Sequence, residues 1–281
     1  MSRIAVIGAG AMGSGIAYQA ARYGIEVNLN DIKQEYLDKG MSGIKNMVRT
    51  GVDKGKIALK DAKELLDRIH PVLDLAESVK DVDLVVEAIF ENMKVKKELF
   101  AKIEDAAKPE TIFASNTSSL SISEIATATK RPDKVVGTHF FNPVYTMKLV
   151  EIVVGKETSN ETVEAAIEFS KQLQKTPVKV KDSPGFIVNR ILIPVLSEAV
   201  KILQEGLATR EDIDTAMTLG ANFPAGPLQL ADFVGLDIAK ATADTLAAGL
   251  GDCYAPPKLL VEKVEKGELG MKSGKGFFEY T

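Results

Sequence analysis

Three glycines near the N-terminus have the spacing of a nucleotide-binding turn. The segment Gly8-Ala-Gly10-Ala-Met-Gly13 follows an apolar run and precedes a segment of helical period. In such a strand–turn–helix unit the first glycine allows a tight turn, and the second lets the backbone approach a pyrophosphate. The third lets helix and strand pack closely, and the helix N-terminus stabilises the anion. These glycines, with Ala11 and Met12 between them, predict a turn that binds a dinucleotide.

A carboxylate at the end of the second predicted strand extends this signal. Asp31 ends the run Glu26–Asp31 and lies 18 residues after Gly13. An acid placed there accepts hydrogen bonds from the adenosine ribose and repels a 2′-phosphate, so Asp31 favours NAD over NADP. Lys33 works against this preference, because a cation there could hold a phosphate. The alternative is a glycine turn followed by an unrelated surface aspartate, and the order strand, turn, helix, strand, acid argues against it.

Histidine is the usual acid or base beside a nicotinamide, because its ordinary pKa lies near neutral pH. The chain has two histidines. His70 precedes Pro71 in a polar connection, where we expect it to be solvated. His139 ends a predicted strand, at the edge where open α/β sheets bind ligands. From position alone, a histidine satisfied in the core is as good an interpretation of His139 as a catalytic one.

Composition excludes several classes of function. The 281 residues suggest two domains. One cysteine, Cys253, cannot form an internal disulfide, and with two histidines it is too small a set for a zinc or iron–sulfur site, so we expect no metal. A net charge of −4 argues against nucleic acid or an anionic membrane as the main partner. The sequence shows neither a secretory leader nor a membrane span, and we expect a cytoplasmic protein.

Apolar runs alternate with segments of helical period through the first two thirds of the chain. Several runs are continuously apolar, as expected for a parallel sheet covered on both faces. The fold class predicted is α/β, with a Rossmann-like doubly wound N-terminal domain. The predicted strands are 3–8, 26–31, 83–88, 111–115, 134–140, 149–154 and 178–181, and the predicted helices are 13–23, 33–50, 60–68, 93–107, 121–129 and 161–174. Ser121 and Glu124 have the spacing of a capping box.

Only helical periods follow Lys181, so an all-helical C-terminal domain is expected. Ser183-Pro184 has the form of an N-cap and a first-turn proline, and it places the boundary at residue 184, between domains 1–184 and 185–281. The predicted helices are 185–206, with a kink at Pro194, then one starting at Thr209, then 227–248 and 256–265. Their many Ala and Leu residues suggest a homodimer interface.

Over its whole length the sequence resembles the 3-hydroxyacyl-CoA dehydrogenase family, and within it the bacterial 3-hydroxybutyryl-CoA dehydrogenases. Besides the glycine motif, the matching segments are Val86-Glu-Ala-Ile-Phe-Glu91-Asn, Ser115-Asn-Thr-Ser118-Ser-Leu, His139-Phe-Phe-Asn142-Pro-Val, Leu149-Val-Glu151-Ile-Val, Asp182-Ser-Pro-Gly-Phe-Ile-Val-Asn189-Arg and Gly270-Met-Lys272-Ser-Gly-Lys-Gly-Phe-Phe. The resemblance implies NAD as cofactor, a CoA thioester as substrate and reversible hydride transfer at its C3 carbon. A dehydrogenase of free β-hydroxy acids, with a catalytic lysine, and a non-catalytic NAD-binding relative are the alternatives.

The resemblance also implies the roles of the site residues. His139 would be the general acid/base and Glu151 its orienting partner, although an outward-facing charge on a strand is the plainer interpretation of Glu151 alone. Ser118 and Asn189 would hydrogen-bond the C3 oxygen, which would place the site between the two domains. Their plainer interpretations are a helix cap and a local backbone contact.

Further contacts to the cofactor and to CoA come from the same comparison. Glu91, Lys96, Ser118, Asn142 and Lys272 match positions around NAD. Ser118, Asn142 and Asn189 are also expected to face the substrate. Lys54 matches a lysine that contacts CoA, whereas a solvated lysine is an equally good interpretation of Lys56.

Overall fold

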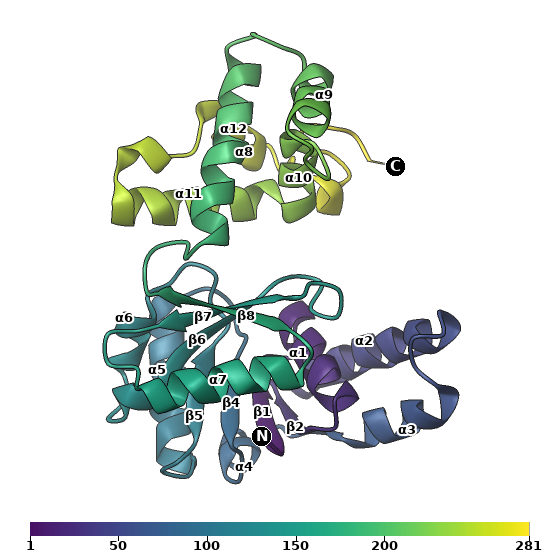
Figure 1. Ribbon diagram of the computed structural model, residues 1–281, viewed down its shortest axis with the longest axis vertical. Helices are drawn as coiled ribbons and strands as arrows, with labels where there is room; N and C mark the ends of the chain where they lie inside the picture. The colour runs from purple at the N-terminus through teal and green to yellow at the C-terminus, as the bar shows by residue number, and fades with distance from the viewer. Residues whose placement is uncertain (281) are drawn as a thin grey trace. The chain divides into compact units, whose positions relative to one another are not determined.

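The computed structural model describes residues 1–280 and divides the chain into two compact units, Met1–Ser183 and Pro184 onward. The first unit, in purple to teal in Figure 1, contains one sheet with helices around it. The second, in green to yellow, is built of helices. The predicted fold class is therefore confirmed.

An eight-stranded sheet organises the first unit. Its strands, in spatial order, are β3 (Ile69–Pro71), β2 (Glu26–Asn30), β1 (Arg3–Ile7), β4 (Leu84–Glu87), β5 (Ile112–Ser115), β6 (Val135–Phe140), β7 (Leu149–Val154) and β8 (Thr176–Lys181). All neighbours pair in parallel except β6 and β7, which are antiparallel. The central strands are buried along almost their whole length, which explains their continuously apolar sequences.

Helices connect the strands and cover the sheet. They are α1 (Ala11–Arg22), α2 (Gln34–Asp53), α3 (Leu59–Asp67), α4 (Leu75–Val79), α5 (Met93–Ala106), α6 (Ile122–Ala126) and α7 (Asn160–Gln172). Figure 1 shows α7 crossing in front of the strands, with α5 behind them. This arrangement brings the carboxyl ends of β1, β2, β4 and β5 to one edge of the sheet, where the predicted site residues follow the strands.

The structure corrects the sequence interpretation in three places of this unit. Residues 69–71 form β3, where a polar connection was expected, and His70 within it contacts the Glu26 carboxylate at 2.7 Å. Helix α4 was not expected. Ser121 accepts a hydrogen bond from the Glu124 amide at 3.1 Å, as predicted. The Glu124 carboxylate, however, lies 3.8 Å from the amine of Lys97 instead of returning to Ser121, so only half of the capping box forms.

The second unit consists of α8 (Val188–Gln204), α9 (Arg210–Gly220), α10 (Pro227–Val234), α11 (Leu236–Leu250) and α12 (Lys258–Glu265), with short 3₁₀ turns at Asp252–Tyr254 and Met271–Ser273. Its core gathers apolar side chains from every helix, among them Leu196, Leu228 and Leu246. Thr209 caps α9 through the Asp212 amide, as its sequence suggested. No helix within residues 1–280 is both long and apolar enough to cross a membrane.

Two helix boundaries in this unit differ from those predicted. Helix α8 begins at Val188 instead of residue 185, because Gly185 and Phe186 have φ values of 71° and 51° and cannot be helical. The predicted helix 227–248 is two helices, since Gly235 between them has φ 100°. The proline at 194 lies inside α8, where the sequence placed it.

Candidate active site

The glycine turn between β1 and α1 has the geometry that its sequence predicts. A Cβ on Gly8 would lie 2.6 Å from the Ala88 carbonyl oxygen, and one on Gly13 would lie 1.7 Å from the Gly8 carbonyl oxygen. These two glycines are therefore required by packing. A Cβ on Gly10 would meet nothing within 4 Å, so this glycine keeps open space at the N-terminus of α1. A pyrophosphate fits that open space beside the exposed amide groups.

Asp31 lies beside this turn at the end of β2. Its carboxylate accepts hydrogen bonds from the amides of Ala9 and Ile32, each at 2.7 Å. A cavity of about 750 Å³ opens here, and its wall includes Gly10, Ala11, Asp31, Lys39, Gly43, Met47, Asn142 and Tyr145. The cavity is thus lined by the glycine turn, by the Asp31 carboxylate and by the segment after β6. This donor and acceptor set fits a dinucleotide.

His139 and Glu151 face each other across the only antiparallel pair of the described sheet. They are register partners on β6 and β7, and Nδ1 of His139 lies 2.7 Å from Oε2 of Glu151. Both side chains are buried, at 7% and 1% exposure. A carboxylate at this distance from Nδ1 favours the tautomer that carries its proton on Nδ1. A buried carboxylate in this position fixes the tautomer and stabilises the imidazolium.

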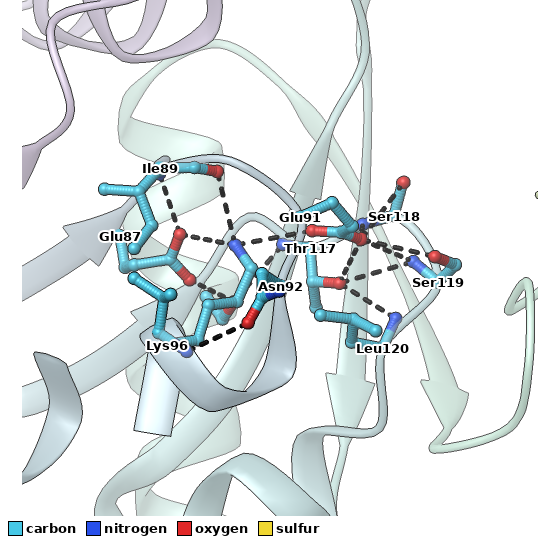
Figure 2. A network of polar contacts seen from close by, with 11 residues as sticks. Glu87, Ile89, Glu91, Asn92, Lys96, Thr117, Ser118, Ser119 and Leu120 are labelled. Atoms are coloured by element: carbon cyan, nitrogen blue, oxygen red, sulfur yellow. Dashed lines mark hydrogen bonds and ion pairs between the residues drawn. The ribbon is translucent and has the colours of Figure 1, made fainter. Parts of the chain in front are cut away.

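A loop after β5 carries Ser118 and is held by Glu91. One carboxylate oxygen of Glu91 accepts hydrogen bonds from the Thr117 hydroxyl at 2.5 Å and from the amides of Ser118 and Ser119 at 2.9 and 3.2 Å (Figure 2). Burial alone would raise the pKa of Glu91, but Lys96 and these hydrogen bonds outweigh it and hold the pKa below its ordinary value. Glu91 is therefore ionised and positions the loop.

The segment after β6 is held by a buried lysine. The ammonium group of Lys175 donates to the carbonyl oxygen of Val144 and, at 2.8 Å, to that of Met147. Burial, with a contribution from the charge of Arg22, lowers the pKa of Lys175 to about 8. The segment tied down in this way also contains Asn142 and Tyr145, which line the cavity.

Comparison with known proteins identifies the family. Residues 3–183 match the model of the NAD binding domain of 3-hydroxyacyl-CoA dehydrogenase, and residues 185–280 match the model of its C-terminal domain. The chain belongs to the 3-hydroxyacyl-CoA dehydrogenase family. It is accordingly an NAD-dependent oxidoreductase, as the sequence indicated.

Relatives of this dehydrogenase align along its full length. It is 49% identical, over 99% of its chain and 100% of the relative, to a probable 3-hydroxybutyryl-CoA dehydrogenase of Deinococcus radiodurans. It is 46% identical to the 3-hydroxybutyryl-CoA dehydrogenase of Clostridioides difficile, over 99% of both chains. Among solved structures, it is similar to the (S)-3-hydroxybutyryl-CoA dehydrogenase PaaH1 from Ralstonia eutropha, with a TM-score of 0.96, 41% identity and coverage of 100% and 99%.

Three expected site residues of the dehydrogenase, Asn189, Lys272 and Lys54, have no established contact with NAD or substrate. Asn189 is the second residue of α8 and is half-buried, and the amine of Lys272 contacts both carboxylate oxygens of Asp237 at 2.5 and 2.6 Å. Both belong to the second unit, so their contacts with NAD or substrate stay predictions. Lys54 is exposed just after α2 and is not among the residues that line the cavity. Its contact with CoA also stays a prediction.

Lys96 occupies an unexpected environment for a residue that contacts NAD. Its side chain is 1% exposed, and its amine lies 2.5 Å from Glu87 and 3.4 Å from Glu91. Sequence reasoning missed Glu87 and Lys175. Glu87 directly follows the apolar run Leu84–Val86. A charged residue that continues a buried strand is unusual, and this signal could have singled out Glu87. A lysine between α7 and β8 gives no comparable signal.

Proposed function

We propose that this dehydrogenase interconverts 3-hydroxybutyryl-CoA and acetoacetyl-CoA, with His139 as the general acid/base. The observation that carries the proposal is the buried His139–Glu151 pair, because a paired imidazole at a ligand-binding edge is suited to proton transfer. The relatives named as 3-hydroxybutyryl-CoA dehydrogenases support the short acyl chain.

NAD would be held by the glycine turn and Asp31, and it would supply the hydride acceptor or, when reduced, the hydride donor. In the direction of reduction, protonated His139 donates from Nε2 to the C3 oxygen as negative charge develops there. Ser118 donates a hydrogen bond to the same oxygen, and Glu151 stabilises the imidazolium. The family resemblance implies a second donor in Asn189. In oxidation, neutral His139 removes the proton of the C3 hydroxyl. The phosphates of CoA would be held by lysines, of which Lys54 is the candidate.

The two alternatives are less well supported. A dehydrogenase of free β-hydroxy acids would use a lysine as acid/base. In this chain the residue on β6 that has a buried carboxylate partner is a histidine, His139. A non-catalytic relative would have no need to bury Glu151 at 1% exposure against that histidine, because burying a carboxylate is costly unless it is paired. Neither alternative gives the His139–Glu151 pair a role.

The decisive assay follows NADH absorbance with acetoacetyl-CoA. We expect turnover with acetoacetyl-CoA and little with free acetoacetate at the same concentration. A series of 3-ketoacyl-CoAs of increasing length then gives the acyl preference from kcat/KM. Loss of NADH with free acetoacetate alone would favour the free-acid enzyme, and no loss with any 3-ketoacyl-CoA would refute the proposal.

The proposal also includes a homodimer or higher homo-oligomer located in the cytoplasm. Large apolar side chains are exposed on the second unit, including Leu219 at 82%, Ile191 at 64% and Phe233 at 60%. An interface between subunits would remove these side chains from water. Sedimentation velocity over a range of concentrations should show a dimer or a higher oligomer, and a monomer at all concentrations would contradict this part of the proposal.

A further inference from the structure

A buried carboxylate that the proposed mechanism does not use lies beneath the Ser118 loop. Glu87 is the last residue of β4, and its side chain is 0% exposed. Its oxygens accept hydrogen bonds from the amine of Lys96 at 2.5 Å, the hydroxyl of Ser115 at 2.6 Å and the amide of Ile89 at 2.8 Å (Figure 2). These three donors offset the cost of removing the carboxylate from water.

Lys96 joins this carboxylate to a second one. From α5, its amine lies 2.5 Å from an oxygen of Glu87 and 3.4 Å from an oxygen of Glu91. The amine is therefore bound more closely to the buried carboxylate than to the one that faces the loop. At 1% exposure the ammonium cannot turn to solvent, and besides the two acids it contacts the carbonyl oxygen of Ile89 at 3.4 Å.

Glu91 connects Lys96 to the loop. The oxygen of Glu91 that holds the hydroxyl of Thr117 and the amides of Ser118 and Ser119 is Oε1, whereas Lys96 approaches Oε2. In Figure 2 the chain of contacts runs from Glu87 through Lys96 and Glu91 to the loop. A lysine drawn closer to Glu91 would turn this carboxylate and weaken its bonds to the loop.

We propose that Glu87 is a positioning residue of this dehydrogenase: by holding Lys96 away from Glu91, it leaves Glu91 to hold the Ser118 loop in its active shape. In this role Lys96 is a buried counter-ion between two carboxylates, and its effect on NAD passes through Glu91. The consequence for turnover rests on the proposed function, through Ser118. The consequence for the loop itself does not.

The main test replaces Glu87 with Gln, which keeps the shape and an acceptor oxygen but removes the charge. Lys96 should then shift to Glu91, and amide hydrogen exchange of the peptide covering 116–121 should become at least about threefold faster. With acetoacetyl-CoA, kcat should fall about tenfold, a typical size for coupled neighbours in one network.

A double variant, Glu87→Gln/Lys96→Met, separates positioning from simple loss of a buried pair. It removes the amine that would pull on Glu91, so loop exchange should return toward the wild-type rate although a second residue has been changed. Glu87→Asp is the milder single variant. It keeps the charge but draws Lys96 back by one methylene, so loop exchange should lie between those of wild type and Glu87→Gln, and it serves if Glu87→Gln does not fold.

A matched control comes from the same helix. Glu104 on α5 lies 3.3 Å from Arg131, with exposures of 12% and 19%, and contacts neither Glu91 nor the loop. Glu104→Gln should lower Tm without changing loop exchange or kcat. Two results would overturn the positioning role. One is loop exchange at the wild-type rate in Glu87→Gln, and the other is faster loop exchange in the double variant than in Glu87→Gln. If the wild-type protein reduces no 3-ketoacyl-CoA, the proposed function fails, and the exchange measurements still decide the role of Glu87.

Discussion

At the scale of single residues, the proposed chemistry depends on two carboxylate pairings. Glu151 is paired with His139 across the sheet, and Glu91 is paired with the Ser118 loop. The sequence could indicate all four residues through the family resemblance. It could not indicate that Lys96 is buried between Glu87 and Glu91, because burial of a charged side chain depends on which segments the fold packs over it.

Replacing His139 by Gln tests the acid/base role. Gln retains a polar side chain of similar size but cannot donate a proton to the developing alkoxide, so kcat should fall by roughly 10²–10⁴-fold. The affinity for NADH, measured by fluorescence titration, should change little because the glycine turn and Asp31 are distant in sequence and unaltered. A variant that retains most of its turnover would refute the role.

Replacing Asp31 by Ala tests the cofactor preference. The carboxylate lies in the cavity wall beside the glycine turn, where it would repel a 2′-phosphate. Its removal should raise kcat/KM with NADPH relative to NADH by about tenfold, a change of roughly 1.4 kcal/mol in discrimination. The two cofactors are compared by initial rates at saturating acetoacetyl-CoA. An unchanged ratio would show that Asp31 does not read the ribose.

At the scale of elements, patterns of apolar residues predicted the strands and helices whose signals are long. The run Ile4–Ile7 and the Thr209 cap are examples, and both lie where the sequence placed them. Short or interrupted elements were not predicted. Strand β3 has three residues and ends in a proline, so it has no measurable period. The break at Gly235 escaped because a glycine within an apolar helical period does not show its φ value.

Lys175 offers a test of how one element is tied to another. Its pKa of about 8 is below its ordinary value of 10.5, so the unfolded chain binds more protons between these two pH values. The free energy of unfolding should therefore rise with pH across this window, by on the order of 3 kcal/mol. Lys175→Met should abolish this rise and also loosen the segment that carries Asn142.

The measurement is urea unfolding of wild type and Lys175→Met at several pH values from 7 to 11. The unfolding free energy of wild type should rise relative to that of Lys175→Met as pH increases. The reason is that the cost of burying the charged amine disappears when Lys175 loses its proton. Lys171→Met is a suitable control, since that lysine is exposed and its side chain contacts Glu168 on the same helix. Parallel pH curves for wild type and Lys175→Met would contradict the assignment.

At the scale of the whole molecule, the predicted site residues are distributed over both units of the chain. The α/β unit contains the glycine turn, Asp31, the His139–Glu151 pair and the Ser118 loop. The helical unit contains Asn189, at the start of α8, and Lys272, whose contacts with substrate and NAD stay predictions. Because the first unit has the whole predicted set of dinucleotide-binding glycines, cofactor binding and turnover should be separable by changing the second unit alone.

Asn189→Ala in the full chain makes that separation. If its amide stabilises the C3 oxygen, the loss should appear where charge develops in the transition state, and kcat should fall by about 10²-fold. The dissociation constant of NADH should stay within about threefold of wild type, since the glycine turn and Asp31 lie in the first unit and are unchanged. Asn222→Ala, at an exposed position of the same unit, is the control and should leave both quantities unchanged. A parallel loss of NADH affinity and kcat would instead mean that Asn189 acts on the cofactor, and an unchanged kcat would remove the helical unit from the chemistry.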